Sequence, residues 1–475
     1  MLTYILNNKS KIPLYEQLYH FIRRDIEQGK LKANQKLPSK RQLSSHLKIS
    51  VITVGAAYSQ LIAEGYITSR PKSGFYINKI DHNFNIYNNY NKNKENHNTN
   101  SINYHTEHLQ EYKYDFKTNV VDTTQFPFDT WARLTREVLS ERSAQLLSKT
   151  DPLGIYGLRQ QIADYLYSFR GIKAKPEQII IGAGSEYLTG LIIQLLGRKN
   201  IYGVENPGYH KTAKIFAMND VKTNYHAMDN YGIDMNYLIN SDTNIIHITP
   251  SHHFPLGIVM PITRRAELLN WAMENDNRYI IEDDYDSEFR FSGRPIPALQ
   301  SLDKYDKVIY MNTFAKSLAP SFRISYMVLP IKLLEYYLNN LLFYSSTVPV
   351  IEQLTLAKFI EKGYFERHIS RMRNIYKLRR DFLINEINNS NLGKICEIKG
   401  QDSGLHLLIK INNNMNEKAL IKSAIENNVR VYGLSEYYFG NIKNYPHNTV
   451  IMGYSGMDLS EIKQAIICLN KSWCK

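Results

Sequence analysis

Two short segments hold the residues that are best suited to chemistry, IIEDDYDSEF at 280–289 and NTFAKSLAPSFRISY at 312–326. Lys316 offers an amine that can form an imine with an aldehyde. Asp283 ends a strand predicted over 279–282, at the edge where ligands of α/β sheets bind, and the phenol of Tyr285 lies two residues further on. These groups suit a phosphorylated pyridine aldehyde, because a carboxylate keeps the pyridine nitrogen protonated and lets the ring accept electrons.

Groups that suit a phosphate lie in the same part of the sequence and in one glycine-rich turn. Arg323 and Thr313 flank Lys316 within one turn and strand. The run GAGSE at 182–186, which includes Gly184 and Ser185, follows a predicted strand and opens a helix. Backbone N–H groups at a helix N-terminus favour anions. The turn alone is a weak signal, but together with the lysine segment it predicts a phosphate site.

The elements around these segments alternate between helices and short apolar strands. Strand-like runs lie at 178–181, 201–204, 245–249, 279–282 and 308–311, with helical stretches between them. Such alternation predicts an α/β fold with a mainly parallel central sheet. A long basic helix over 367–387 follows, and from about residue 365 we expect a smaller C-terminal α+β subdomain.

Residues 114 to 470 resemble the fold-type I, PLP-dependent aminotransferases, and more narrowly the MocR/GabR subfamily of GntR regulators. The resemblance extends over DPLGIYGLRQQIADYL, IIIGAGSEYL, ENPGYHK, TPSHHFPLGIVMP and the two segments above. It implies that pyridoxal 5'-phosphate (PLP) binds as a Schiff base on Lys316, with Asp283 at the pyridine nitrogen and Tyr285 at the ring oxygen.

The same resemblance assigns the remaining cofactor contacts. Arg323, Thr313 and Ser185 fall at phosphate positions, and Tyr209 faces the cofactor. His252 or His253 lies over the other side of the ring. The alternative is that the motifs preserve only the fold, but a fold alone has no need for an imine-forming lysine beside that carboxylate.

The first 79 residues have the pattern of three helices and a hairpin. Pro13 opens a helix with an apolar stripe at Leu14, Leu18, Phe21, Ile22 and Ile26, and Gly29 ends it. Ser39 and Gln42 form a capping pattern for a second helix, and Ser50 caps a third that runs to about Glu64. We expect Val54, Tyr58, Leu61 and Ile62 on the buried face of that third helix. The strands 66–68 and 75–77 flank the turn PKSG, which predicts a winged helix-turn-helix.

This pattern resembles the N-terminal domain of GntR-type regulators in KLPSKRQLSSHLKIS, AYSQLIAEGYI and KSGFYI. We expect DNA contacts from the third helix, from the start of the second and from the wing, at Val51, Ile52, Thr53, Gly55, Lys40, Arg41, Lys72 and Gly74. The family usually has arginines where this chain has Val51 and Gly55, whereas Arg41 matches a usual contact. Gly55 either permits a close approach to DNA or is merely tolerated in the helix.

Charge and composition support this division of the chain. Through residue 80 there are 13 Lys or Arg against 4 Asp or Glu, so this block holds 9 of the net +13 charges and suits a polyanion. We expect a winged-helix domain over 1–79, an Asn-rich flexible linker over 80–113 and a PLP-binding domain over 114–475. Three cysteines without metal spacing, and no long apolar segment, favour a reduced, cytoplasmic protein without a metal site or a membrane partner.

Two classes of function compete for the second domain. An aminotransferase holds the carboxylate of its substrate with an arginine near the C-terminus, but Gly456 occupies that position, and Lys211 stands where a second arginine is expected. We therefore predict a homodimeric regulator of operator DNA, not an enzyme, which senses PLP and resembles the regulators of pyridoxine biosynthesis. The alternatives are a regulator that senses an amino acid as an external aldimine, with Arg290, Arg294 or Arg430 as the cation, or a working aminotransferase.

Overall fold

The computed structural model describes residues 2–79, 112–141, 144–291, 293, 296–440 and 445–474. The chain forms two compact units, Met1–Gln110 and Glu111–Lys475. The boundary between them falls inside the linker predicted at 80–113, most of which lies outside the described residues. The division of the chain into three segments therefore stays a prediction, and each unit is described by itself.

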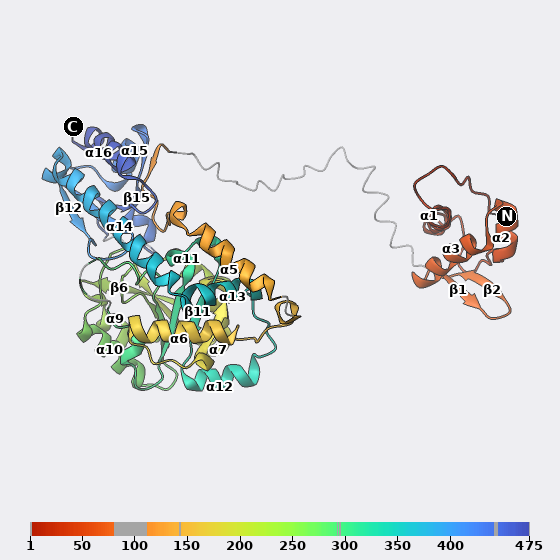
Figure 1. The fold of residues 1–475 in the computed structure, drawn as a ribbon, viewed down its shortest axis with the longest axis horizontal. Helices are drawn as coiled ribbons and strands as arrows, with labels where there is room; N and C mark the ends of the chain where they lie inside the picture. The colour runs from red at the N-terminus through yellow and green to blue at the C-terminus, as the bar shows by residue number, and fades with distance from the viewer. Residues whose placement is uncertain are drawn as a thin grey trace. The chain divides into compact units, whose positions relative to one another are not determined.

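The smaller unit is a winged helix-turn-helix (Figure 1). Its elements are α1 (Leu14–Glu27), α2 (Lys40–Leu47), α3 (Val51–Ala63), β1 (Ile67–Arg70) and β2 (Gly74–Ile77). The predicted capping box is confirmed, because the Ser39 hydroxyl accepts from the backbone N–H of Gln42 and the Gln42 side chain accepts from that of Ser39. β1 and β2 pair antiparallel and form the wing.

The core of this unit confirms most of each predicted apolar stripe, but Leu14 and Phe21 of α1 are only partly buried and do not belong to its cluster. Leu18, Ile22 and Ile26 of α1 pack against Val54 and Leu61 of α3 in a single cluster. Ile62, however, is 38% exposed, so its predicted place on the buried face of α3 was wrong. Since 3.6 residues make one turn, Val54, Ala57, Tyr58 and Leu61 already complete the inward stripe, and Ile62 is rotated beyond its edge.

The larger unit is built on an eight-stranded sheet in the order β4-β11-β10-β9-β8-β5-β6-β7 (Figure 1). The strands are β4 (Ile179–Gly182), β5 (Tyr202–Asn206), β6 (Thr223–Asp229), β7 (Gly232–Ile233), β8 (Ile245–Ile248), β9 (Tyr279–Asp283), β10 (Val308–Thr313) and β11 (Ser325–Val328). Strands β6, β5, β8, β9 and β10 run parallel, whereas β11 is antiparallel to both of its neighbours. The predicted mainly parallel α/β fold is confirmed.

Helices cover both faces of this sheet, because alternate residues of its strands point to opposite sides. One face packs on α5 (Phe128–Ser140), α6 (Tyr156–Arg170), α9 (Met235–Ile239), α10 (Ile262–Met273) and α13 (Val350–Glu361). The other packs on α7 (Ser185–Leu196), α8 (His210–Met218) and α12 (Ile331–Asn340). Ile179 and Ile181 join the first set and Ile180 the second.

The C-terminal part is the predicted smaller α+β subdomain. Its four-stranded sheet has the order β12-β13-β16-β15, with β12 (Cys396–Lys399), β13 (His406–Ile411), β15 (Tyr432–Gly433) and β16 (Thr449–Gly453). It packs with α14 (Tyr364–Asn388), α15 (Glu417–Glu426) and α16 (Leu459–Trp473). A separate pair, β3 (Tyr114–Asp115) with β14 (Val429–Arg430), ties the start of the larger unit to this subdomain.

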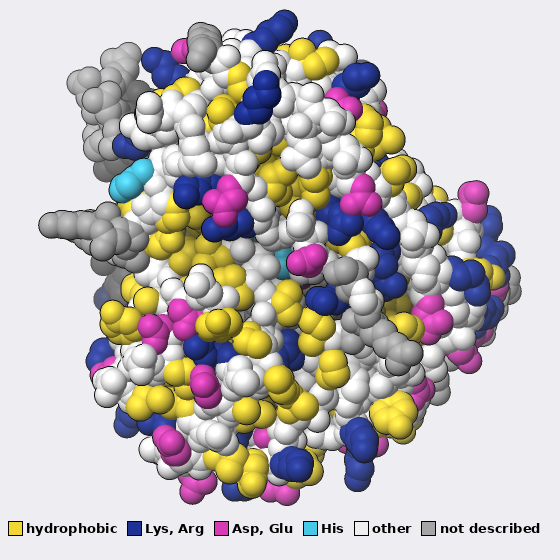
Figure 2. All heavy atoms as spheres, turned by 90° about the vertical axis from the view of Figure 1, so that its left-hand side faces the viewer, with side chains coloured by type: hydrophobic (Ala, Val, Ile, Leu, Met, Phe, Trp, Pro, Cys, Tyr) yellow, Lys and Arg dark blue, Asp and Glu magenta, His cyan; other side chains and the backbone are white. Residues whose placement is uncertain are grey.

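Charged side chains of both signs lie on the surface (Figure 2). The face drawn in Figure 2 shows basic and acidic side chains interspersed with apolar ones. Among the described residues no helix is long and apolar enough to cross a bilayer. Within the same residues, no group of three or more His, Cys, Asp or Glu side chains is arranged to hold a metal ion. Cys396, Cys468 and Cys474 form no disulfide.

Candidate functional site

Lys316 lies at the end of β10, next to the strand that carries Asp283. The two strands are parallel, and Met311 pairs in register with Asp283. Lys316 follows in the short helix α11 (Phe314–Ser317), where its Nζ donates to the backbone carbonyl of Asn119 at 2.7 Å. Burial lowers the pKa of the Lys316 amine to about 8, against the opposing charge of Asp286. A larger share of this amine is therefore nucleophilic at neutral pH than for an exposed lysine.

Asp283 and Tyr285 each lie beside a histidine. The Asp283 carboxylate lies 3.4 Å from Nε2 of His247 on the neighbouring strand β8. The hydroxyl of Tyr285 lies 3.2 Å from Nδ1 of His252, which is also 2.8 Å from the Asp286 carboxylate. Burial, with the charges of Asp286 and Asp283, raises the pKa of Tyr285 well above its usual value, so this phenol keeps its proton.

A cradle for an anion lies at the N-terminus of α7. Gly184 caps this helix with φ +98°, and a Cβ there would stand 2.2 Å from Nη2 of Arg323, so only glycine leaves room for the guanidinium. Arg323 itself has φ +53° and donates from Nη2 to the carbonyl of Ala183 at 3.4 Å. The structure thus brings the predicted phosphate residues Gly184 and Arg323 into contact, with Ser185 as the first residue of α7.

Thr313 and Tyr209 lie at the same side of the sheet but have other contacts. The Thr313 hydroxyl caps α11 by accepting from the N–H of Ala315 at 3.1 Å, and the hydroxyl of Ser325 lies 2.8 Å from it. Tyr209 precedes α8, is 46% exposed and meets the ring of Phe254 edge-on. Their roles toward a cofactor therefore stay predictions.

Sequence reasoning missed four contacts of this site. Glu186 forms ion pairs with Arg323 and with Lys211, His247 lies beside Asp283, and the Asn119 carbonyl holds Lys316. Lys211 and the glycine-rich turn that includes Glu186 were both noted in the sequence, but the ion pair between them was not predicted. A backbone carbonyl such as that of Asn119 has no signature in a sequence.

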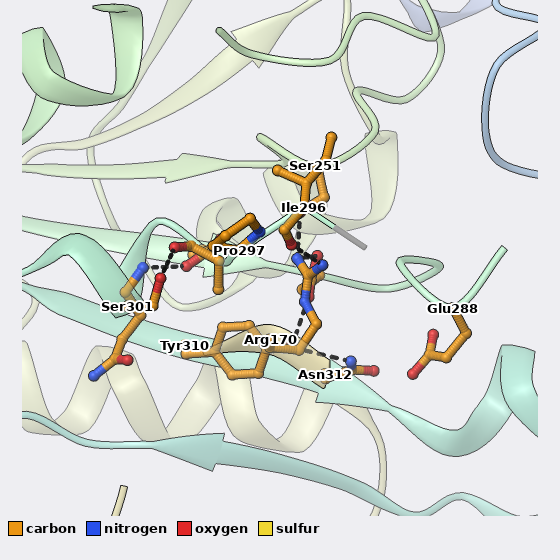
Figure 3. Close-up of polar contacts among 12 residues, drawn as sticks. Arg170, Ser251, Glu288, Ile296, Pro297, Ser301, Tyr310 and Asn312 are labelled. Carbon is orange, nitrogen blue, oxygen red and sulfur yellow. Dashed lines mark hydrogen bonds and ion pairs between the residues drawn. The ribbon is translucent and has the colours of Figure 1, made fainter. Parts of the chain in front are cut away.

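A buried polar network around Arg170 includes Ser251 and Tyr310 (Figure 3). Nε of Arg170, at the end of α6, lies 2.8 Å from the carboxylate of Asp284, and Nη2 donates to its other oxygen at 3.0 Å. Tyr310 donates to Asp284 at 2.6 Å, and Arg170 also donates to the hydroxyl of Ser251 at 2.7 Å. Although burial opposes it, the charge of Asp284 raises the pKa of Arg170. This network fixes the backbone from which Asp283 and Tyr285 project.

The position expected to bind a substrate carboxylate is filled by apolar atoms. A Cβ at Gly456 would stand 2.9 Å from Cγ1 of Val120. The nearby cation Arg379 is already paired with Asp122 at 2.6 Å. Of the arginines considered as substitutes, Arg430 stacks over the ring of Tyr432, and Arg294 lies outside the described residues.

Arg290 is the remaining substitute. Its Nε and Nη1 are buried and have no hydrogen-bond partner among the described residues. It lines a small cavity together with Ser287, Ser403 and His252, and the Ser287 and Ser403 hydroxyls are likewise without a described partner. The unpaired N–H groups of this guanidinium thus lie beside a cavity of about 10 Å³, about the space of one water molecule.

The donor set as a whole fits PLP. The absence of a side chain at Gly184 lets the guanidinium of Arg323 lie at the N-terminus of α7, and this combination suits a phosphate. Lys316 supplies the amine, Asp283 the carboxylate and Tyr285 the phenol, all at the carboxyl ends of β9 and β10 or just beyond.

The smaller unit presents the predicted DNA contacts on one helix, one helix start and one turn. Val51 and Ile52 of α3 are exposed, Ile52 by 83%, and Arg41 is exposed at the start of α2. Lys72 at the wing tip has φ +57°. A Cβ at Gly55 would meet only Cδ and Nζ of Lys40, each at 3.9 Å, so the fold itself does not require glycine there.

Comparison with protein families divides the chain in the same way. Residues 111–466 match the family of aminotransferases of class I and II, and residues 14–77 match the bacterial regulatory proteins of the gntR family. Among solved structures, an archaeal alanine:glyoxylate aminotransferase is similar with a TM-score of 0.68 and 23% identity, covering 77% of this chain and 91% of the other. At that identity the likeness concerns the fold.

Several curated relatives align with nearly the whole chain. The uncharacterized HTH-type transcriptional regulator YdeL of Bacillus subtilis is 39% identical over 99% of both chains. The probable rhizopine catabolism regulatory protein MocR of Rhizobium meliloti is 30% identical, covering 99% of this chain and 95% of the relative. The HTH-type pyridoxine biosynthesis transcriptional regulator PdxR of Corynebacterium glutamicum is 28% identical over 97% and 98%.

Proposed function

Because this chain belongs to the aminotransferase class I and II family and also carries a gntR-family domain, we propose that it is a transcription regulator that senses PLP. The observation that carries the proposal is the group formed by Lys316, Asp283 and Tyr285, with a cradle at Gly184 and Arg323. A domain kept only for its fold has no use for a buried amine of lowered pKa beside this set.

Each of these residues has a definite task toward the cofactor. When bound, PLP supplies an electrophilic aldehyde and an electron-accepting ring. Lys316 is the attachment point, and the carbonyl of Asn119 orients its amine. Asp283, which lies beside His247, holds a proton at the pyridine nitrogen. Tyr285 donates to the ring oxygen, with His252 fixing the direction of its hydroxyl.

PLP itself is the favoured signal, because the position for an amino acid carboxylate is closed. Val120 occupies the space beside Gly456, and Arg379 is engaged by Asp122. Without a charged partner, a desolvated carboxylate costs several kcal/mol. Binding of PLP orders the larger unit, and the segment between the units transmits this change to the winged helix.

A second candidate, sensing of an amino acid on bound PLP, is favoured by one observation. The buried Nε and Nη1 of Arg290 have no partner among the described residues. Unpaired guanidinium N–H groups can donate to a carboxylate. Residual aminotransferase activity would require the same contact.

The partners follow from the smaller unit. The exposed face of α3 and the wing suit the grooves of operator DNA, with Arg41 at a phosphate. We further propose that the protein acts as a homodimer on two half-sites in the cytoplasm, since helix-turn-helix dimers mirror the symmetry of their operators.

The test combines absorbance with DNA binding. PLP is titrated into the wild-type protein and into Lys316→Ala. The titration follows the absorbance band at about 420 nm that this cofactor gives when it is joined to a lysine. DNA from the protein's own promoter region is then titrated with and without PLP. A Lys316-dependent band together with a change in DNA affinity on PLP alone supports the proposal. A band that moves only with a particular amino acid favours the second candidate, and no band refutes both.

A further inference from the structure

The carboxylate of Glu186 lies in the anion cradle of the larger unit. One of its oxygens pairs with Arg323 and the other with Lys211. Its own backbone N–H, in the first turn of α7, also donates to it. Although burial opposes the effect, Lys211, this N–H and Arg323 lower the pKa of Glu186 to about 2, so the carboxylate is charged at any physiological pH.

The groups that hold Glu186 are those that a phosphate at this place would use. Arg323 is the nearest guanidinium to the glycine turn, and the N–H groups at the start of α7 face the same point. Lys211, the second cation, reaches over from α8. In this structure Arg323, Lys211 and the N–H of Glu186 already contact an anion that belongs to the chain.

Two anions cannot share this cradle at low cost. Charges about 4 Å apart repel each other strongly at a partly buried site. A phosphate that enters must therefore displace the Glu186 side chain, which is only partly buried and can turn toward solvent. The exchange gives up two ion pairs for those that the phosphate makes.

We propose that Glu186 is an internal competitor for the phosphate of the ligand and sets the affinity of this regulator for PLP. The inference rests on the proposed function, since it concerns the same site. A sensor must release its ligand when the supply falls, whereas an enzyme gains from holding its cofactor permanently. Glu186 weakens the binding of the phosphate group and leaves the contacts of Lys316, Asp283 and Tyr285 with the rest of the ligand unchanged.

The effect is selective for ligands that carry a phosphate. Pyridoxal has the aldehyde, the ring nitrogen and the ring oxygen of PLP but no phosphate, so it does not compete with Glu186. Removing the Glu186 charge should increase the affinity for PLP and leave the affinity for pyridoxal unchanged. The ratio of the two dissociation constants is therefore the diagnostic quantity.

The experiment measures dissociation constants of PLP and pyridoxal by absorbance for the full-length wild type, Glu186→Gln and Glu177→Gln. Glu177 is exposed in the same unit and serves as the matched control. We expect Glu186→Gln to bind PLP about tenfold or more tightly, with pyridoxal and the control unchanged. An unchanged or weaker affinity for PLP in Glu186→Gln overturns the proposal, and so does an equal gain for both ligands.

A second readout separates this inference from the proposed function. Inorganic phosphate is titrated into the cofactor-free proteins, and the rise in melting temperature is compared between wild type and Glu186→Gln. The variant should respond at about tenfold lower phosphate. A gain for phosphate in a protein that never binds PLP through Lys316 refutes the proposed function alone, whereas equal responses refute the role of Glu186. If the glutamine variant folds poorly, Glu186→Ser removes the same charge and is read in the same two ways.

Discussion

The guanidinium of Arg170 and the carboxylate of Asp284 lie 2.8 Å apart, and their side chains are 4% and 0% exposed. Asp284 lies directly between Asp283, the last residue of β9, and Tyr285. The buried pair thus joins the end of α6 to the turn that carries two of the proposed cofactor residues. The shape of the site therefore depends on this ion pair.

Breaking this pair should destabilise the larger unit strongly. Asp284→Asn leaves the Arg170 charge buried without a counter-ion, so we expect a loss of about 3–5 kcal/mol in the free energy of unfolding, measured with urea. The control is Asp242→Asn, which breaks a pair with Lys222 in which both partners are more than half exposed. That change should cost about 1 kcal/mol at most. Equal effects of the two substitutions would contradict the assigned role.

The pH dependence of PLP attachment should report the Lys316 amine. Burial lowers its pKa to about 8, so the unprotonated, reactive fraction is about a tenth at pH 7 and rises to about nine-tenths at pH 9. The rate of appearance of the absorbance band should therefore increase about tenfold over this range and then level off. A rate that still climbs beyond pH 10 would indicate an ordinary exposed lysine instead.

The sequence predicted the strands that place the site because each is a short run of apolar residues followed at once by polar ones. Asp283 and Lys316 both stand just after such runs, and the parallel pairing of β9 and β10 brings them to one edge. β6 and β11 were not among the predicted strands. β6 has the sequence TNYHAMD, in which only His226 is fully buried, so it lacks an apolar run. β11 has only four residues and begins inside the lysine motif.

Contacts between residues that lie far apart in the chain could not be predicted from the sequence. Glu186 meets Lys211 across 25 positions and Arg323 across 137, and Asn119 meets Lys316 across 197. In a sequence, a charged residue at the start of a helix is equally compatible with a solvated side chain and with one partner of an ion pair. Only the approach of α7, α8 and the turn before β11 decides between them.

A substitution at Gly55 distinguishes its effect on folding from its effect on DNA binding. An alanine Cβ would meet only the side chain of Lys40, at 3.9 Å, and glycine inside a helix costs about 1 kcal/mol relative to alanine. Gly55→Ala should therefore raise the free energy of unfolding of the smaller unit by up to about 1 kcal/mol. If operator affinity nevertheless falls, glycine is kept for close approach to DNA, and if affinity is unchanged it is merely tolerated. A loss of stability would contradict the open space seen beside Gly55.

Arg41 should contact a DNA phosphate without reading sequence. It is exposed in the first turn of α2, next to Lys40, whose ammonium lies over the ring of Phe75 at 5.3 Å and is thereby directed along the wing. Arg41→Ala should weaken operator and unrelated DNA by a similar factor, because a phosphate contact carries no base information. The slope of log affinity against log salt should fall by about 1, since one fewer counter-ion is released. Lys30→Ala, which removes an exposed cation paired with Asp25 in the turn after α1, is the matched control and should leave the slope unchanged. A loss confined to the operator would mean that Arg41 reads a base, and no loss on either DNA would exclude it from the interface.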